Sequence, residues 1–261
     1  MRRPADFIYP ALPVGVLVAA WFLATHFLHV SSFLLPKPEQ VAFRLAQGLA
    51  SGDLLPHILA TLSAAIGGFL LGSGVALAVA AAVAESRWVD RCLYLPLVGI
   101  QSMPKIAVSP IIAMWVGFGL GSMVAMAAVT CFFPVFANSL AGFRGADKDL
   151  VDLYRVSGGS RLRILFNVKL PTAASAIFSG LQVAAVLALI GTVVMEFLIA
   201  SRGLGFLIMD ASTTLDSAQA YAAILLLGVS GAAGTHAIRA VGRRIVFWNP
   251  EASTGGAEAS T

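Results

Sequence analysis

The feature that most limits the fold of this chain is the length of its stretches without charged side chains. Residues 54–84 contain no Asp, Glu, Lys or Arg, and residues 92–143 contain only Lys105. A helix needs about 20 apolar residues to cross the hydrocarbon core of a bilayer. Only 11% of the residues are charged, whereas soluble domains average about 25%. We therefore predict an all-α integral membrane protein.

Apolar runs and the breaks between them predict six transmembrane helices. The glycine cluster at residues 117–122 divides the longest run, because glycines interrupt helices. The apolar run near the N-terminus is too long for the core of a signal peptide, so we expect it to remain as the first span. The predicted spans are residues 10–30, 54–84, 102–116, 122–140, 171–199 and 220–238.

Three further segments complete the predicted organisation. Residues 39–52 and 206–219 are mixed in polarity and are expected to form short helices at the membrane interface. Residues 251–261 are expected to form a disordered C-terminal tail. Residues 1–250 then form a single transmembrane domain, which contains one long polar loop at residues 144–170.

Basic residues are distributed unequally between the two sets of loops. The N-terminus, the 85–91 turn, the 144–170 loop and the segment after the last span hold thirteen Lys and Arg residues, whereas the other loops hold three. Positively charged loops stay on the cytoplasmic side. The N-terminus, the C-terminus and the 144–170 loop are therefore predicted to be cytoplasmic. The short basic clusters lie between apolar runs, which argues against nucleic-acid binding despite the net charge of +4.

A polar stretch inside the 144–170 loop is predicted to form a short helix. Asp149 is a suitable N-cap, and Asp152 at the third helical position suits the positive end of the helix dipole. Gly158 and Gly159 are expected to end the helix, because glycine adopts the left-handed C-cap conformation without steric cost. The helix would then be about eight residues, or roughly 12 Å, long.

The remainder of the loop is predicted to connect this helix to the fifth span. Ser160 is expected to cap a second helix at residues 161–170, and Pro171 is expected to bend the chain into the span. An exposed helix that carries Tyr154 and Arg155 would fit a groove on a cytoplasmic partner, since aromatic and Arg side chains commonly anchor protein contacts. The alternative is an amphipathic loop helix that lies on the lipid headgroups, and the residues alone leave both interpretations open.

Sequence motifs for several other functions are missing. The sequence has no G-x-S-x-G, H-E-x-x-H or C-x-x-C motif, which argues against an integral membrane enzyme. None of its four lysines follows a glycine, so it has no phosphate-binding loop for ATP. Energy for transport would then come from a partner. The alternative is a self-contained secondary transporter, or another membrane protein without an ATPase partner, and the small number of buried ionisable residues disfavours it.

The 144–170 loop resembles the cytoplasmic loop of permeases from binding-protein-dependent ABC importers. Those permeases carry a Glu-Ala-Ala motif, a glycine and a final Leu-Pro, and this chain has Asp152-Leu153-Tyr154, Gly158 and Leu170-Pro171 at these places. Residues 103–107, 115–119 and 201–205 resemble the branch that imports nitrate, sulfonates, taurine and related small solutes. The resemblance extends over about residues 36–248. Asp152 keeps the acidic group of the motif, whereas Leu153 and Tyr154 are larger than the usual alanines.

The resemblance implies a type I importer fold in the inner (plasma) membrane of a bacterium. It also implies a homodimer that binds two cytoplasmic ATPase subunits and an extracytoplasmic solute-binding protein. ATP and Mg would bind to the ATPase, and this chain would carry no cofactor. The solute would be a small anion such as nitrate, a sulfonate or taurine. The residues implied to couple the permease to its ATPase are Asp152, Leu153, Tyr154, Arg155, Gly158, Gly159, Ser160, Arg161 and Pro171.

A few polar residues in the predicted spans are candidates for the solute pathway. Lys105 would either reach the cytoplasmic headgroups or favour an anionic solute inside the pathway. Glu196, near the outer end of the fifth span, is expected to pair with Arg202 or to contact the binding protein. Gln101 is the third pathway candidate. The separated histidines and cysteines lack the spacing of metal ligands, so no metal site is predicted.

Overall fold

The computed structural model describes residues 5–27, 31–86, 88–92, 96, 99 and 103–248. Throughout these ranges the regular secondary structure is helical. The predictions for residues 28–30, for Gln101 and for the tail at residues 251–261 lie outside the described residues. The helices are α1 (Ala5–Phe27), α2 (Pro38–Ser51), α3 (Leu54–Glu85), α5 (Lys105–Val116), α6 (Leu120–Arg144), α7 (Lys148–Val156), α8 (Arg161–Ile164), η1 (Leu165–Lys169), α9 (Leu170–Ile199), α10 (Leu204–Thr214) and α11 (Ser217–Ile245).

The chain divides into two compact units. The first unit consists of residues 1–60 and 201–228, and the second consists of residues 61–200 and 229–261. Helices α3 and α11 each contribute to both units. The prediction of one transmembrane domain over residues 1–250 stays a prediction.

Within the described part of the chain, four helices are long and apolar enough to cross a bilayer. They are residues 54–85, 120–144, 161–199 and 217–245. These segments contain the helices predicted at 54–84, 122–140, 171–199 and 220–238, and they confirm that each is helical. The agreement is close because the ends of these helices coincide with charged or glycine-rich turns that are visible in the sequence.

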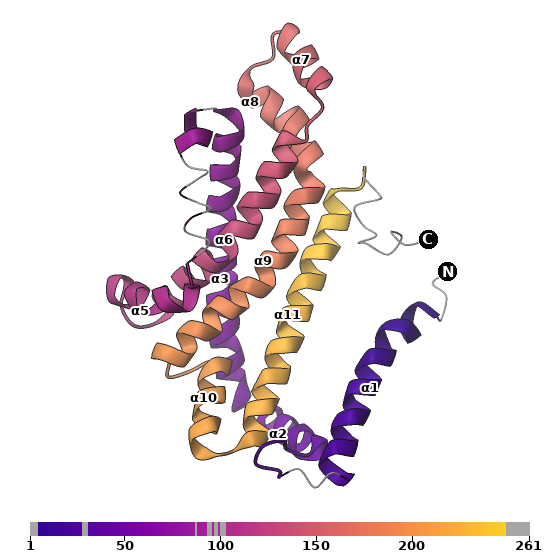
Figure 1. Cartoon of the computed structure of the whole chain (residues 1–261), viewed down its shortest axis with the longest axis vertical. Helices are drawn as coiled ribbons and strands as arrows, with labels where there is room; N and C mark the ends of the chain where they lie inside the picture. The colour runs from indigo at the N-terminus through magenta and orange to yellow at the C-terminus, as the bar shows by residue number, and fades with distance from the viewer. Residues whose placement is uncertain are drawn as a thin grey trace. The chain divides into compact units, whose positions relative to one another are not determined.

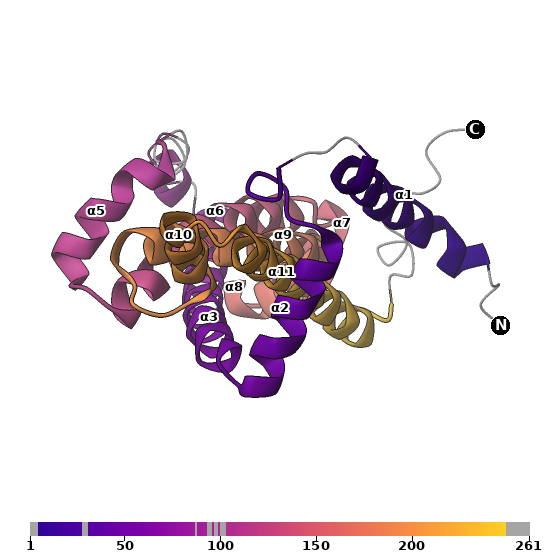
Figure 2. The ribbon, with the colours of Figure 1, turned by 90° about the horizontal axis from the view of Figure 1, so that it is seen from below.

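Helix α5 is shorter than a transmembrane span requires. Its 12 residues extend about 18 Å, whereas the hydrocarbon core is roughly 30 Å thick. Gly117, with φ of +93°, ends α5, and Gly119, with φ of +136°, precedes α6. Figures 1 and 2 together show α5 running across the direction of α6 and α9. The described apolar part of α1, residues 15–27, is also short, so the count of six spans stays a prediction.

The second unit is built on close packing of α3, α6 and α9 (Figure 1). Small residues allow these backbones to approach each other, as is common between helices in lipid. A Cβ atom at Gly72 of α3 would lie 2.5 Å from the carbonyl oxygen of Ala128 on α6. A Cβ atom at Gly180 of α9 would lie 2.9 Å from the carbonyl oxygen of Pro134. One buried core cluster of this unit consists of Ala76, Ala80, Val83, Ala127, Cys131, Val135, Phe136, Leu140, Phe143, Ala173, Ile177, Ala184 and Ala188.

The first unit has its own small core at the start of α3. Leu54, Leu204, Leu207 and Ala223 are buried together there. His57 joins α3 to the turn before α10, because its Nδ1 accepts a hydrogen bond of 3.1 Å from the backbone N–H of Gly203.

The boundary between α10 and α11 differs from the prediction. Helix α10 ends at Thr214, and Leu215 adopts the left-handed conformation with φ of +63°. The Oδ1 atom of Asp216 then accepts a hydrogen bond of 3.2 Å from the N–H of Gln219 at the start of α11. The prediction of one helix over residues 206–219 was therefore wrong at its C-terminal end, because an aspartate in that segment caps a new helix.

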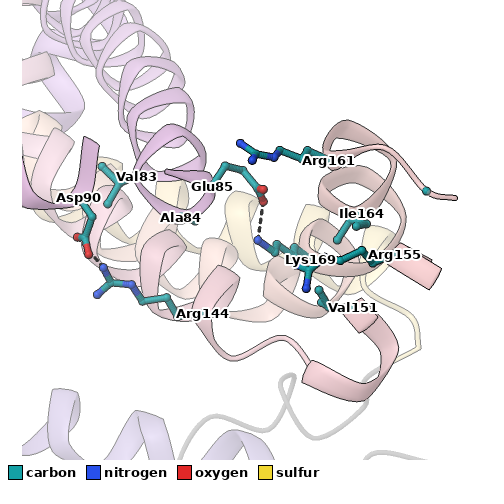
Figure 3. A pocket seen from close by; sticks show the side chains of 11 residues that line it. Val83, Ala84, Glu85, Asp90, Arg144, Val151, Arg155, Arg161, Ile164 and Lys169 are labelled. Atoms are coloured by element: carbon teal, nitrogen blue, oxygen red, sulfur yellow. Dashed lines mark hydrogen bonds and ion pairs between the residues drawn. The ribbon is translucent and has the colours of Figure 1, made fainter. Parts of the chain in front are cut away.

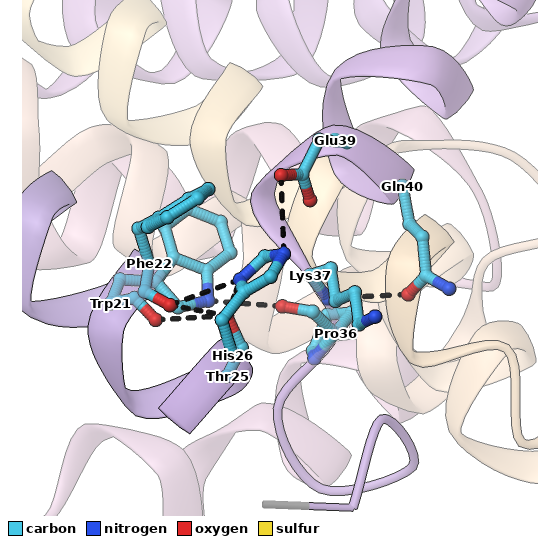
Figure 4. Close-up of polar contacts among 8 residues, drawn as sticks. All are labelled: Trp21, Phe22, Thr25, His26, Pro36, Lys37, Glu39 and Gln40. Atoms are coloured by element: carbon cyan, nitrogen blue, oxygen red, sulfur yellow. Dashed lines mark hydrogen bonds and ion pairs between the residues drawn. The ribbon is translucent and has the colours of Figure 1, made fainter. Parts of the chain in front are cut away.

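Polar contacts hold the end of α1 against the start of α2 (Figure 4). The indole N–H of Trp21 donates a hydrogen bond of 3.0 Å to the carbonyl oxygen of Pro36. Nε2 of His26 lies 3.6 Å from Oε1 of Glu39. These contacts give His26 a structural role in the first unit.

Candidate functional site

Helix α7 of the 144–170 loop begins earlier than the sequence predicted. Asp147 is the N-cap, and its Oδ1 accepts a hydrogen bond of 2.9 Å from the backbone N–H of Asp149. The prediction of Asp149 as the N-cap was therefore wrong, and Asp149 lies in the first turn. Asp152 lies beyond the third helical position, where its Oδ1 is 2.8 Å from Nη1 of Arg155. Asp147 and Asp149 supply the negative charge that the start of the helix favours.

The C-terminal end of α7 is fixed by two glycines with different roles. Gly158 has φ of +79°, a conformation that costs other residues about 1–2 kcal/mol. The N–H groups of Gly158 and Gly159 donate to the carbonyl oxygens of Arg155 and Tyr154, at 3.2 and 2.8 Å. This is the paired hydrogen bonding of a Schellman cap. A Cβ atom at Gly159 would lie 2.6 Å from the carbonyl oxygen of Tyr154, so the predicted glycine stop is confirmed at both positions.

Helix α7 carries an exposed apolar stripe formed by Leu150, Leu153 and Val156. Their side chains are 46, 61 and 88% exposed, and their three-residue spacing places them on neighbouring positions of one helix face. No residue of α7 is buried. Tyr154 is half-buried and is thus less exposed than predicted. Val156 was not among the predicted coupling residues, although its three-residue spacing from Leu153 was a usable signal in the sequence.

The segment after α7 begins with the predicted cap. The hydroxyl oxygen of Ser160 accepts a hydrogen bond of 3.3 Å from the backbone N–H of Arg163, which confirms Ser160 as an N-cap. The helical run that starts at Arg161 continues to Ile199.

A π-helix, η1, joins α8 to α9 within this run. The N–H of Leu170 donates to the carbonyl oxygen of Leu165, five residues earlier. Pro171 follows at once, and a proline ring in a regular α-helix would collide with the carbonyl group four residues before it. The wider π-turn accommodates this proline. The prediction of a separate helix that ends before Pro171 was therefore wrong.

A cleft of about 660 Å³ lies beside α7 and α8, at the end of α3 (Figure 3). It contains three of the predicted coupling residues, Arg155, Gly159 and Arg161. Pro171 lies elsewhere, and its carbonyl oxygen accepts a hydrogen bond of 3.3 Å from the indole of Trp248. The cleft carries a net positive charge. It is lined by Val83, Ala84, Glu85, Asp90, Arg144, Val151, Arg155, Gly159, Arg161, Ile164 and Lys169.

Two ion pairs in this cleft were not predicted. Nζ of Lys169 lies 2.5 Å from Oε1 of Glu85, and Nη2 of Arg144 lies 2.7 Å from Oδ1 of Asp90. The partners are separated by 84 and 54 positions in the sequence, so no local pattern relates them. The only usable signal was the presence of acidic residues in the 85–91 turn opposite a basic loop.

The ammonium group of Lys105 contacts the middle of α6. Its Nζ donates a hydrogen bond of 3.4 Å to the carbonyl oxygen of Thr130. Thr130 is about 15 Å along the helix axis from Leu120 and about 21 Å from Arg144. This position disfavours a side chain that reaches toward headgroups at the Arg144 end of α6.

A cavity of about 420 Å³ lies beside Lys105. Lys105 is the one charged residue among the described residues that line it. An ammonium group at this depth is costly unless water or an anion compensates its charge. The other lining residues are Leu71, Gly72, Val75, Met103, Val108, Ala128, Val129, Phe132 and Phe133.

Glu196 is buried near the end of α9. Its side chain is 1% exposed, and its Oε1 accepts a hydrogen bond of 2.7 Å from the hydroxyl of Thr61 on α3. The predicted pairing with Arg202 stays a prediction, because the two residues belong to different units. Within the described residues, no group of three His, Cys, Asp or Glu side chains could hold a metal ion.

The apolar helices define a multi-pass membrane protein, and comparison with known proteins identifies its family. The model of the family described as the binding-protein-dependent transport system inner membrane component matches residues 72–247. This match covers more than half of the chain and includes the whole 144–170 loop. The chain therefore belongs to this family, the inner-membrane permeases of binding-protein-dependent ABC importers.

Several named relatives are similar over most of the chain. A riboflavin transport system permease protein of Chloroflexus aurantiacus is 36% identical over 88% of this chain and 87% of its own length. A protein of Bacillus subtilis named for aliphatic sulfonates transport is 30% identical over 95% of this chain and 90% of its own length. The taurine transport system permease protein of Escherichia coli is 26% identical over 91% of this chain and 88% of its own length. The relatives are transport permeases named for different solutes.

Proposed function

We propose that this chain forms the solute pathway of an ABC importer and is coupled to a cytoplasmic ATPase through α7. The observation that carries the proposal is the combination of a rigid Schellman cap and an exposed apolar stripe on one short helix. The cap fixes the direction of α7, and the stripe at Leu150, Leu153 and Val156 leaves apolar surface uncovered in this chain. A short amphipathic helix of this kind suits a groove on another protein.

The proposed assembly contains two copies of this chain, two ATPase subunits and an extracytoplasmic solute-binding protein. ATP and Mg bind to the ATPase, and this chain holds no cofactor. The N-terminus, the C-terminus and the 144–170 loop face the cytoplasm, as the distribution of basic residues favours. Closure of the ATPases on ATP would then displace the two α7 helices and rearrange the six spans of each copy.

The solute is proposed to be a small anion, such as nitrate, a sulfonate or taurine. The main support is Lys105, whose ammonium group lies at the middle of α6 beside a cavity. Among the described residues it has no acidic partner within ion-pair distance. An anion that passes this point would compensate the charge. Glu196 and Gln101 are proposed as further pathway residues.

A retention assay tests the proposed coupling helix. The chain is co-expressed with an ABC ATPase subunit from the same organism, and the complex is captured in detergent through a tag on the permease. Leu153→Asp and Val156→Asp should each lose the ATPase, because a carboxylate in an apolar groove is strongly unfavourable. Leu215→Asp should retain it, since Leu215 is as exposed as Leu153, at 61%, but lies in the turn between α10 and α11. Retention of the ATPase by both α7 variants would refute the proposal.

A further inference from the structure

The end of α3 and the segment that follows it, which is helical at residues 88–92, are tied to both ends of the 144–170 loop. Glu85, the last residue of α3, pairs with Lys169 at 2.5 Å, and Asp90 pairs with Arg144 at 2.7 Å (Figure 3). Arg144 is the last residue of α6, and Lys169 directly precedes α9. Helices α7 and α8 lie between these two residues in the sequence. Each ion pair therefore holds one stem of the loop that carries α7.

The Lys169–Glu85 pair is placed to resist movement better than an ordinary surface pair, whereas the Arg144–Asp90 pair is more exposed. The side chains of Lys169 and Glu85 are only 15 and 23% exposed, and solvent screens such pairs less than fully exposed ones. Those of Arg144 and Asp90 are 48 and 35% exposed, so this second pair is the weaker of the two.

An apolar layer lies beneath the ion pairs. Val83 on α3 and Phe143 on α6 are 2 and 3% exposed and belong to the same buried core. Val89 of the helical segment at residues 88–92 and Leu165 of η1 pack against that core. One apolar core is thus shared by the end of α3, the segment that follows it and both stems of the loop. The ion pairs fix the positions of these elements relative to one another.

We infer that Glu85 and Asp90 are positioning residues that clamp the loop stems to the end of α3. A single tie would let the loop pivot about one point, whereas two ties at opposite stems restrain that rotation. A displacement of α7 is then passed to α3, α6 and α9 together rather than absorbed by bending of the stems. This inference rests on the proposed function, because it assumes that an ATPase moves α7.

The ratio of ATP hydrolysed to solute imported tests the clamp. The ratio is measured with the complete transporter, consisting of permease, ATPase and binding protein, in proteoliposomes. In the variant Glu85→Gln with Asp90→Asn, ATP hydrolysis should persist while uptake falls, so that the ratio rises about fivefold. The charge-swapped variant, Glu85→Lys with Lys169→Glu, should restore the Glu85 tie and keep the ratio within about twofold of the parent.

A matched control removes an ion pair of similar geometry far from the loop in the sequence. Arg44 and Asp216 in the first unit lie 2.5 Å apart, and Arg44→Gln should leave the ratio unchanged. If the double variant does not fold, Glu85→Gln and Asp90→Asn are measured singly, each with an expected rise of about twofold.

The outcomes separate this inference from the proposed function. Folded clamp variants that retain the ATPase and keep the parental ratio would overturn the clamp and leave the permease function standing. A swapped variant that folds, retains the ATPase and stays uncoupled would also overturn it. Failure of the parent chain to retain any ATPase would instead refute the proposed function itself.

Discussion

Single residues decide where α7 begins and ends. The glycines at the end of α7 are required for two different reasons. Gly158 has a positive φ, and Gly159 has no space for a Cβ atom. Asp147 and Asp149 are both good N-caps, and nothing local in the sequence distinguishes them. In the structure Asp147 is the N-cap. Asp152 therefore lies further from the start of the helix than predicted, and it pairs with Arg155.

Substitution of Gly158 tests the importance of the cap. Gly158→Ala places a Cβ atom on a residue with φ of +79°, which costs about 1 kcal/mol or more and frays the last turn of α7. We expect a lower number of solute molecules imported per ATP hydrolysed. Gly145→Ala is the control, because Gly145 ends α6 with an ordinary φ of −77°. Equal transport stoichiometry in the two variants would contradict the role of the cap.

The effect of the Lys105 charge on solute uptake can be tested by substitution. Lys105→Gln keeps a polar group but removes the compensating charge, so uptake of an anionic solute should fall about tenfold, equivalent to about 1.4 kcal/mol. Lys105→Arg should retain most uptake because the charge is kept. The measurement is initial uptake rate at matched protein level. Full activity of the Gln variant with unchanged selectivity would remove Lys105 from the pathway.

At the scale of helices, the long apolar elements could be predicted and the irregular joints could not. Helix α3 was predicted at residues 54–84 and observed at 54–85, because the charge-free run that forms it is bounded by Asp53 and Glu85. The π-turn before Pro171 and the cap at Asp216 were missed. The π-turn depends on a backbone hydrogen bond from Leu170 to Leu165, and the cap depends on a hydrogen bond from the backbone N–H of Gln219 to the side chain of Asp216. Neither contact leaves a periodic pattern in the sequence.

Two glycines of α3 provide a matched test of helix packing. Gly72→Ala would place a Cβ atom 2.5 Å from the carbonyl oxygen of Ala128, whereas nothing lies within 4 Å of a Cβ atom at Gly74. Overpacking of this kind costs about 1–3 kcal/mol, so Gly72→Ala should lower the thermal midpoint in detergent. Gly74→Ala should match or slightly exceed the parent. Equal midpoints for both variants would argue against close contact of α3 with α6.

At the scale of the whole molecule, hydropathy was sufficient to predict the class of protein. It was not sufficient to predict the ion pairs between residues that are distant in the sequence. Long charge-free runs predicted the four long helices, and the loop motif predicted the family that the comparison identified. The ion pairs Glu85–Lys169 and Asp90–Arg144 join residues far apart in sequence. Such pairs depend on how helices pack, which a single sequence does not encode locally.

The predicted orientation of the chain is testable by labelling. Cys92→Ser and Cys131→Ala first remove the native thiols. A new cysteine is then introduced by Thr213→Cys or by Ser157→Cys, both at exposed positions. A membrane-impermeant maleimide should label the Thr213 variant in intact spheroplasts and the Ser157 variant only after lysis. The reverse pattern would place the 144–170 loop outside the cytoplasm.

Solute uptake into proteoliposomes tests most directly whether this permease depends on an ATPase acting through α7. Vesicles contain the permease with or without its ATPase, and binding protein loaded with solute is supplied on one side with ATP on the other. We expect accumulation only when ATPase and ATP are both present, and its loss in Leu153→Asp. Equal accumulation by the permease alone would contradict ATPase-driven transport, and full accumulation in Leu153→Asp would contradict the role of α7.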